Sequence, residues 1–289
     1  MTDLIQPIVN GILLGGLYAA VAIGLSLMFG IVRLINLAHG DLMITASYLS
    51  LVMVEQVGLS PLTAAVMVVP MLFPAGFGLQ KYVLNRALRR GPEPPIIVAL
   101  GISIVLQNVL LLIFSPDARS IPANVAVLAV PVTENLSLPV IYLMGFGVGC
   151  TAIAAVHVLV RRTRLGRAIR AASEDDETAR LMGIDTEYVH CCAMGIAVTT
   201  AAVAGVLVGM TFTFYPHSGP QYLLIAFGVI VIGGVGSMTG ALAGGIVLGL
   251  AQLVGAHVFG PGHQLLCGYL VLLAVLAVRP HGILGRANS

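Results

Sequence analysis

Charge in this 289-residue chain is concentrated in one stretch, residues 161–187, and long apolar segments lie on both sides of it. The stretch holds six of the 14 Lys and Arg residues and six of the 12 Asp and Glu residues. Charged side chains are costly in hydrocarbon and are rare within membrane-spanning segments. We therefore expect residues 161–187 to lie in water, at one end of a domain whose remaining length is embedded in a membrane.

The composition agrees with a membrane domain. Hydrophobic residues make up 58% of the chain and charged residues only 9%, whereas a soluble domain carries about 25% charged residues. The sequence predicts an all-α, polytopic membrane helical bundle of about eight or nine transmembrane segments, with short, glycine-interrupted helices near its end. Residues 1–289 are expected to form a single transmembrane domain. The apolar segments lie at 8–30, 38–57, 61–80, 95–115, 139–160 and 188–212, and near 222–236, 240–258 and 264–278.

Glycines recur at helical spacing in the first and last apolar segments. Small residues four apart let membrane helices approach closely. We expect most of these glycines to pack helices within the chain, and the others to contact a second subunit or the substrate. The glycines in question are Gly11, Gly15, Gly236, Gly240, Gly244, Gly245 and Gly249.

The basic residues fall into three clusters, which predict the orientation of the chain. The clusters span Lys81 to Arg90, residues 161–180, and Arg279 with Arg286. Cytoplasmic flanks of membrane segments are enriched in Lys and Arg, so all three clusters are expected in the cytoplasm. The loop 116–138 is expected outside, as is the N-terminus. The C-terminus is expected inside, after three crossings that follow residue 220.

Within the charged stretch, residues 174–182 carry the signals of a short helix. Ser173 is placed as its N-cap, the acids at 174–177 would occupy the first turn, where the helix dipole favours them, and Gly183 would end it in the left-handed conformation. So short a helix is marginal in water by itself. It is either a turn within an ordinary cytoplasmic loop or a docking helix for a partner. The residues that would share its outer face are Thr178, Leu181 and Met182.

The run RLGRAIRAASEDDETARLMGI at 164–184 resembles the cytoplasmic coupling loop of ABC-importer permeases, in the family that takes up branched-chain amino acids. The resemblance extends to NLAHGDLM at 36–43, GGVGSMTGALAGG at 233–245 and RPHGILG at 279–285, so it covers nearly the whole chain. The NLAHG form is similar to the shorter of the two permease types. The resemblance implies that the short helix sits in a groove of an ATPase subunit. The residues that it assigns to this coupling are Arg167, Ser173, Glu174, Asp175, Asp176, Ala179, Leu181, Met182 and Gly183.

The resemblance also implies the partners and the compartment. The chain is expected to be a multi-pass protein of the bacterial inner membrane, in contact with lipid, a second homologous permease, two cytoplasmic ATPase subunits and a periplasmic substrate-binding protein. It contains no GxxxxGK[ST] motif, so it cannot hydrolyse ATP with a P-loop. ATP and Mg²⁺ are expected on the partner ATPases, and no cofactor is expected in this chain. The basic residues are spread along the membrane flanks, so no nucleic-acid partner is expected.

Polar residues interrupt the apolar pattern at two places, 36–41 and 236–239. Helix N-termini at such interruptions can face a cavity and bind a carboxylate group of a substrate. Alternatively, these residues only cap helices. Residues 215–220 are predicted to form an external turn that faces the delivered substrate. The predicted translocation-pathway residues are Asn36, His39, Gly40, Asp41, Gly236, Ser237 and Thr239.

Other classes of function are less compatible with the sequence. A secondary transporter normally uses intramembrane carboxylates, and both candidates, Asp41 and Glu55, are expected at the membrane interface. A serine protease would need Ser237 with His257 or His263, but the pattern GVGSM departs from the GxSx of rhomboid-like proteases. HxxxH, HExxH and CxxC motifs are absent from the sequence, so neither a metal site nor a catalytic residue is predicted. An importer for urea, short amides or aromatic acids remains an alternative.

Overall fold

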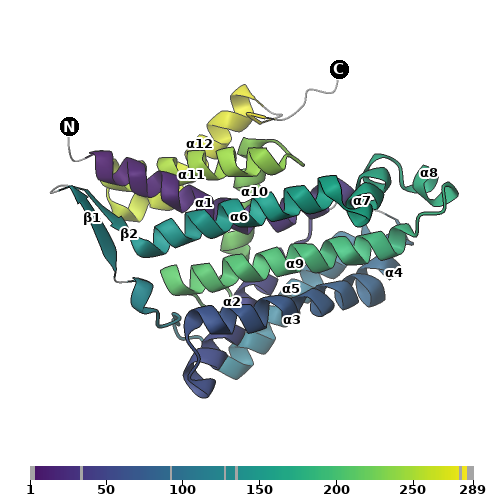
Figure 1. Cartoon of the computed structure of the whole chain (residues 1–289), viewed down its shortest axis with the longest axis horizontal. Helices are drawn as coiled ribbons and strands as arrows, with labels where there is room; N and C mark the ends of the chain where they lie inside the picture. Colours follow the sequence, from purple (N-terminus) through teal and green to yellow (C-terminus); the bar gives the residue numbers. More distant parts are fainter. Residues whose placement is uncertain are drawn as a thin grey trace.

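The computed structural model describes residues 4–32, 35–91, 93–126, 128–133, 136–279 and 282–284, and most of them are helical (Figure 1). A short antiparallel hairpin, β1 (Ala129–Thr133) and β2 (Leu136–Pro139), lies between α5 and α6. The predicted all-α membrane bundle is therefore confirmed. The α-helices are α1 (Ile5–Val32), α2 (His39–Val57), α3 (Pro61–Leu79), α4 (Asn85–Leu88), α5 (Pro94–Phe114), α6 (Val140–Arg162), α7 (Arg164–Glu174), α8 (Asp176–Leu181), α9 (Thr186–Thr211), α10 (Gly219–Gly233), α11 (Met238–Phe259) and α12 (Gln264–Val278). A π-helical turn, Gln80–Leu84, joins α3 to α4, and 3-10 turns lie at Asn124–Ala126 and Pro261–His263.

Seven helical segments of the described chain are long and apolar enough to span a membrane. They are Ile5–Ile31, Pro61–Leu88, Pro94–Phe114, Val140–Arg162, Thr186–Thr211, Met238–Phe259 and Pro261–Val278. The other two predicted segments, 38–57 and 222–236, correspond to α2 and α10, and each of these helices begins inside the bundle. α10 has 15 residues, fewer than the roughly 20 that a bilayer core requires. The irregular residues 35–38 and 212–218 extend these two crossings toward opposite ends of the bundle.

Close contacts between glycines hold the central helices together. Gly11 lies against Leu250 and Gly15 against Ile246, so α1 and α11 are antiparallel. A Cβ atom at Gly15 would overlap the backbone of Ile246, which is why only a residue without a side chain allows this approach. The prediction that these glycines pack helices within the chain is confirmed for this pair.

The helices form two halves with corresponding neighbours. In the first half, α1 packs most extensively on α11, and in the second half α9 packs most extensively on α3. In the same way α2 contacts α9, and α10 contacts α1. The order α1, α2, α3, α5 thus corresponds to α9, α10, α11, α12, with opposite directions. Repeats of inverted topology are common in transporters, and substrate sites lie where their discontinuous helices meet.

The two ends of the bundle differ in character. The N-terminal end of α1 and the β-hairpin lie at one end, and α7 and α8 lie at the other (Figure 1). Arg89 binds Glu187, at the start of α9, with two hydrogen bonds of 2.9 and 2.8 Å, and residues 283–284 bond to the end of α10. The described basic clusters therefore share one end of the bundle, and the described part of loop 116–138 lies at the opposite end. The assignment of these two ends to the cytoplasm and the outside stays a prediction. Arg286 lies outside the described residues.

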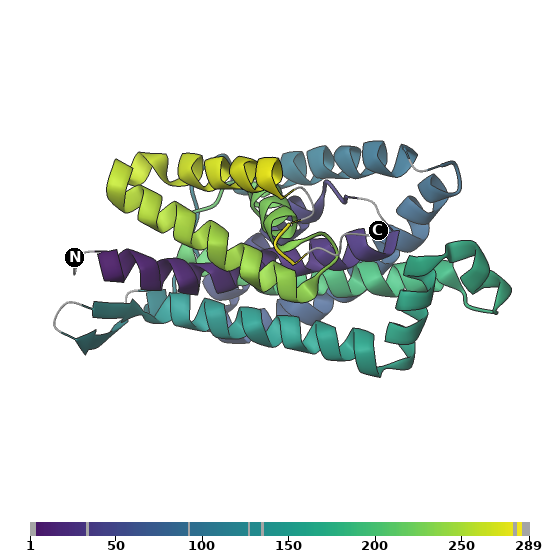
Figure 2. The same cartoon turned by 90° about the horizontal axis from the view of Figure 1, so that it is seen from above.

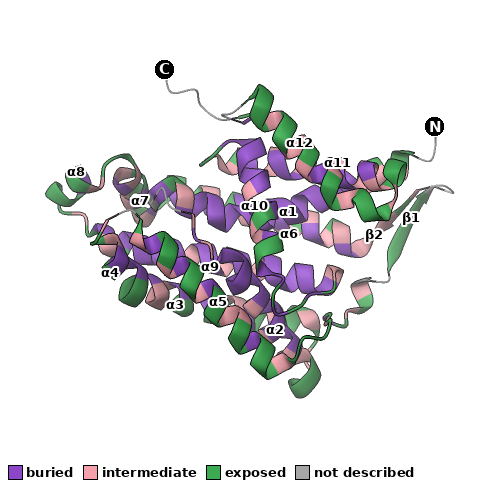
Figure 3. Cartoon of the chain, turned by 180° about the vertical axis from the view of Figure 1, so that it is seen from behind, coloured by how far each residue is buried: buried purple, intermediate pink, exposed green. Residues whose placement is uncertain are grey.

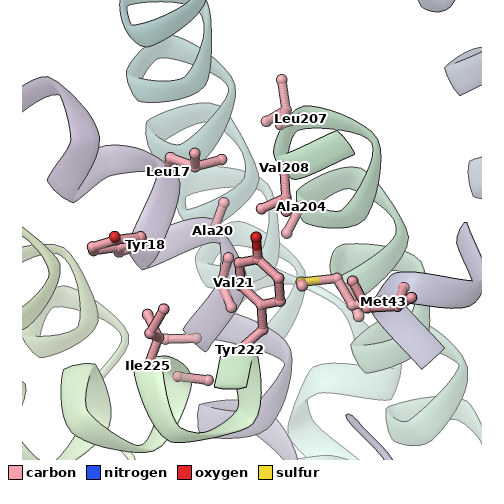
Figure 4. Packing of buried hydrophobic residues seen from close by; sticks show 14 of the residues in the cluster. Leu17, Tyr18, Ala20, Val21, Met43, Ala204, Leu207, Val208, Tyr222 and Ile225 are labelled. Atoms are coloured by element: carbon pink, nitrogen blue, oxygen red, sulfur yellow. The ribbon is translucent and has the colours of Figure 1, made fainter. Parts of the chain in front are cut away.

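α5 and α12 are the most exposed of the long helices. They lie on the same side of the bundle, opposite α6 (Figure 2), and present exposed side chains along their length (Figure 3). The core of the bundle is apolar, and Figure 4 shows residues of α1, α2, α9 and α10 in mutual contact, among them Val21, Met43, Val208 and Tyr222. The start of α2 and the start of α10 both border this core.

Candidate translocation and coupling sites

The first interruption, residues 36–41, comprises a turn and the first residues of α2, and most of it is buried in the bundle. The Asn36 side-chain carbonyl accepts a hydrogen bond from the Ala38 N–H at 3.0 Å, and its amide points to the Met194 sulfur at 3.7 Å. His39 is 2% exposed, and its Nε2 lies 3.0 Å from the carbonyl oxygen of Val21, in the middle of α1. Asn36 and His39 thus fix the start of α2 to α1 and α9.

Asp41 is completely buried in the first turn of α2. Ser103, in the middle of α5, donates a hydrogen bond of 2.6 Å to its Oδ2, and the Gln107 amide donates to the Ser103 hydroxyl at 3.1 Å. Oδ1 has no hydrogen-bond partner within the described ranges. The expectation that Asp41 lies at the membrane interface is therefore wrong. Its neighbour Ser103 carries no sequence signal that distinguishes it from other helical serines.

α10 begins directly against this carboxylate. A Cβ atom at Gly219 would overlap the Asp41 side chain, and a Cβ atom at Gly40 would overlap the carbonyl oxygen of Gly219. We call this contact between residues 39–41 and 218–219 the junction. Residues 215–220 were expected to form an external turn, but Pro216, Ser218 and Gly219 are buried, so that expectation is wrong for this part. The discontinuous helices meet here because neither glycine has a side chain.

Polar side chains next to the junction are exposed. Gln221, in the first turn of α10, is exposed, and so are Tyr215 and His217, whose rings are stacked with centroids 5.6 Å apart. The first backbone N–H groups of a helix have no acceptor within it. Exposed polar groups at the depth of the bundle's centre are unfavourable against lipid. Sequence analysis missed Gln221 because nothing in its local pattern places it at this depth.

The second interruption, 236–239, does not join the junction. Gly236, Ser237 and Thr239 line a cavity of about 800 Å³ at the end of the bundle that carries α7. Ser237 caps α11, since its hydroxyl accepts a hydrogen bond of 3.0 Å from the Gly240 N–H. The predicted pathway residues therefore form two separate groups, one at the centre and one at the end. Their part in translocation remains a prediction.

The charged stretch forms two helices, α7 and α8, rather than one. Ser173 lies within α7 and donates its hydroxyl to the Arg170 carbonyl oxygen, so its assignment as the N-cap is wrong. Asp175 caps α8, accepting hydrogen bonds from the N–H groups of Glu177 and Thr178 at 3.0 and 3.1 Å. The Thr178 hydroxyl also bonds to Asp175 at 2.7 Å, and these bonds lower the pKa of its carboxyl. Glu174 therefore ends α7 instead of starting the coupling helix.

The other features predicted for this helix are present. Gly183 has φ +83°, in the left-handed region, and Ile184 N–H bonds back to the Ala179 carbonyl oxygen. Ala179 is 4% exposed, whereas Leu181 and Met182 are 87% and 79% exposed. Within the helix Asp176 pairs with Arg180 at 2.8 Å, and Arg180 also donates a hydrogen bond of 2.7 Å to the Thr186 hydroxyl at the start of α9. Arg167 is exposed on α7, one helix before α8.

Known proteins provide an independent comparison. Residues 7–278 match the family described as branched-chain amino acid transport system / permease component. The chain is 32% identical over 295 residues to the high-affinity branched-chain amino acid transport system permease protein BraD of Pseudomonas aeruginosa, covering 98% of this chain and 96% of BraD. It is 33% identical over 298 residues to the corresponding permease protein LivH of Escherichia coli K12, with the same coverage.

A more distant similarity extends beyond amino-acid permeases. The fructose import permease protein FrcC of Rhizobium meliloti is 27% identical over 208 residues, covering 67% of this chain and 57% of FrcC. No solved structure matches the chain. The match over residues 7–278, with relatives above 30% identity over almost the full length, shows that this multi-pass inner-membrane chain belongs to the family of permease components of branched-chain amino acid transport systems.

Proposed function

We propose that this chain is one of two permease subunits of an ABC importer for branched-chain or related amino acids. Two separate ATPase subunits would bind at the α7–α8 end, and a periplasmic binding protein would deliver substrate at the opposite end. The observation that carries this proposal is α8, a capped helix whose two large apolar side chains, Leu181 and Met182, are exposed. Membership of the family supports branched-chain or related amino acids as the class of substrate.

A protein surface fits α8 better than a membrane surface does. The helix has six residues, and isolated helices of that length are not stable in water. Asp175, Asp176 and Glu177 lie at the other end of this short helix, and the anionic cytoplasmic leaflet would repel them. A groove in a folded partner could cover Leu181 and Met182 without that repulsion. This is the arrangement expected of a coupling helix in an ATPase groove.

The second permease would pack against the side formed by α5 and α12. α5 exposes Ile97, Ile104 and Leu112 on this side, and Asn108 is exposed among them. An amide at this depth is unfavourable in lipid, and interfaces between membrane helices accommodate such groups by hydrogen bonding across helices. The pathway would then lie between the two permeases, next to the exposed polar groups of the junction.

Alternating access would arise from movement at both interruptions. α7 connects α8 to the bundle and packs on α1, α6 and α9. A pull on α8 by the closing ATPases would therefore shift the wall that faces residues 236–239. At the centre, the two discontinuous helices meet at their N-terminal ends, so they could separate without breaking a continuous helix. Residues 36–41 would thus control the middle of the pathway, and residues 236–239 its cytoplasmic end.

Cysteine labelling tests the position of the pathway. In a background without the four native cysteines, Gln221→Cys is expected to react with a membrane-impermeant thiol reagent in the assembled importer, because a water-filled pathway would reach it. Its reactivity should change between the ATP-bound and nucleotide-free states. Ala154→Cys is the control, since this residue is also exposed and lies on α6, the helix on the side of the bundle opposite α5 and α12 (Figure 2). Equal labelling at the two positions in both states would contradict this pathway.

A further inference from the structure

The Asp41 carboxylate is a buried acidic group without a basic partner. The residue is completely buried, and no ion pair joins it to a Lys, Arg or His side chain among the described residues. Ser103 donates a hydrogen bond of 2.6 Å to Oδ2, but Oδ1 has no hydrogen-bond partner in the same part of the chain. A carboxylate removed from water is unfavourable unless positive groups compensate its charge. That compensation has to come from groups other than basic side chains.

Two helix N-termini provide positive charge beside it. Asp41 lies in the first turn of α2, and its Oδ1 lies against the start of α10, where it would overlap a Cβ atom at Gly219. The Ser218 side chain does not cap α10, because its hydroxyl accepts a hydrogen bond of 2.9 Å from the Tyr215 N–H. The first N–H groups of a helix lack acceptors and carry partial positive charge. The N-termini of α2 and α10 therefore both favour the ionised form of Asp41.

This arrangement changes the charge that the junction can offer to a substrate. Helix N-termini at such a break are expected to bind a substrate carboxylate, but a carboxylate of the chain itself already lies between these two. If α10 moves away from α2, Oδ1 loses the positive end that faces it, and its charge then requires a cation. The exposed Pro220 and Gln221 directly follow Gly219, so this movement would open Oδ1 toward an accessible surface.

We propose that Asp41 binds the ammonium group of the transported amino acid when the junction opens, while the released N-terminus of α10 faces the substrate carboxylate. The substrate would thus replace both partners of the contact that opening breaks. The inference rests on the proposed function, since amino acids carry both charges at neutral pH. An ammonium group has three N–H donors, which suits a carboxylate that has one oxygen without a partner.

Asp41 would in this way make opening depend on substrate. In the closed junction the start of α10 compensates the carboxylate, and in the open junction only a bound ammonium group does so. A ligand shifts a conformational equilibrium toward the state that it binds more tightly, so leucine would favour the open junction. Without substrate, the uncompensated charge would favour the return of α10 to α2. The junction would then stay closed in an importer that has nothing to transport.

Competition for leucine binding to the assembled importer tests this assignment. Binding of radiolabelled leucine is measured by scintillation proximity without the binding protein, so that only the membrane complex selects. The amine 3-methylbutylamine is leucine without its carboxylate, and 4-methylpentanoate is leucine without its ammonium group. The amine should compete about tenfold better or more, because Asp41 would repel the acid. Asp41→Asn should weaken leucine binding on the order of 30-fold or more and remove the preference for the amine.

The matched control is Glu55→Gln, which removes the same charge from an exposed position on the same helix. Its leucine affinity and its preference for the amine should equal those of the wild type. Ser103→Ala removes a hydrogen bond but keeps the carboxylate, so it should retain the preference for the amine. Gln221→Cys provides a second readout. Leucine should increase the thiol labelling at this position when Asp41 is present, and it should have no effect in the Asp41→Asn background.

Equal leucine affinity and an unchanged preference in Asp41→Asn would overturn the inference and leave the proposed function standing. Stronger competition by 4-methylpentanoate in the wild type would also overturn it, whether or not Asp41→Asn assembles. Labelling of Gln221→Cys that follows sodium or pH instead of leucine would assign Asp41 to a coupling ion. Leucine accumulation without leucine binding or leucine-dependent labelling would equally overturn the inference. If the wild-type importer neither binds nor accumulates leucine, the proposed function fails, and this inference fails with it.

Discussion

Met182→Asp is expected to abolish ATP-dependent uptake while the permease still inserts into the membrane. The side chain is 79% exposed, so the substitution leaves the packing of the chain unchanged. In a complex with the ATPase it would place an unpaired carboxylate in a buried interface, at a cost of about 2–5 kcal/mol, which corresponds to on the order of 30-fold weaker association or more. Uptake in proteoliposomes and retention of the ATPase in a pull-down measure the two effects.

Two further variants separate docking from a general effect of substitution. Met182→Leu keeps an apolar tip and should retain uptake and ATPase binding. Gly183→Val should act like Met182→Asp, because φ +83° is strongly disfavoured for a β-branched residue and the end of α8 would have to rearrange. If Met182→Asp and Gly183→Val both kept full uptake and normal ATPase retention, α8 would not be the coupling helix.

Gly219→Ala is expected to reduce uptake on the order of tenfold or more by forcing the junction apart. The added Cβ atom would overlap the Asp41 carboxylate, and overpacking a buried contact costs about 1–3 kcal/mol. α2 and α10 would have to separate or rotate, which would misplace both discontinuous helices. Initial uptake rates, normalised to the amount of chain in the membrane, provide the measurement.

Gly147→Ala is the control for this prediction. Gly147 lies inside α6, and nothing lies within 4 Å of the Cβ position that alanine would occupy. Uptake should therefore match the wild type, and alanine in the middle of a helix is about 0.5–1 kcal/mol more favourable than glycine. Normal uptake by Gly219→Ala would show that the junction tolerates a change of spacing and that the pathway does not depend on it.

The sequence predicted the elements that depend on local or one-dimensional signals. The apolar segments, the common end of the described basic clusters and the helix-ending Gly183 were all predicted correctly. The N-cap was misplaced by two residues because serine and aspartate cap helices about equally well. Asp175 is the N-cap in the structure because its carboxylate accepts hydrogen bonds from two N–H groups and from the Thr178 hydroxyl. Ser173 and Glu174 therefore lie inside the preceding helix.

The junction could not be predicted from local patterns. It joins residues 39–41 to 218–219 and depends on a close contact of Gly219 with Gly40 and the Asp41 carboxylate, which are far from it in the sequence. The run YPHSGP has the composition of a surface turn, and only the tertiary structure shows that it ends beside Asp41. Ser103 was missed for the same reason, because a buried partner for Asp41 has no signature within α5.

The most direct test of the central claim is leucine uptake by proteoliposomes that contain the complete set of subunits. With this chain, its partner permease, the ATPases, the binding protein and ATP inside, leucine should accumulate against its gradient. Omission of this chain, or of ATP, should stop accumulation. Accumulation by this chain without ATPases, driven by a proton or sodium gradient, would contradict the account and would point to the buried Asp41 as an ion-coupling residue.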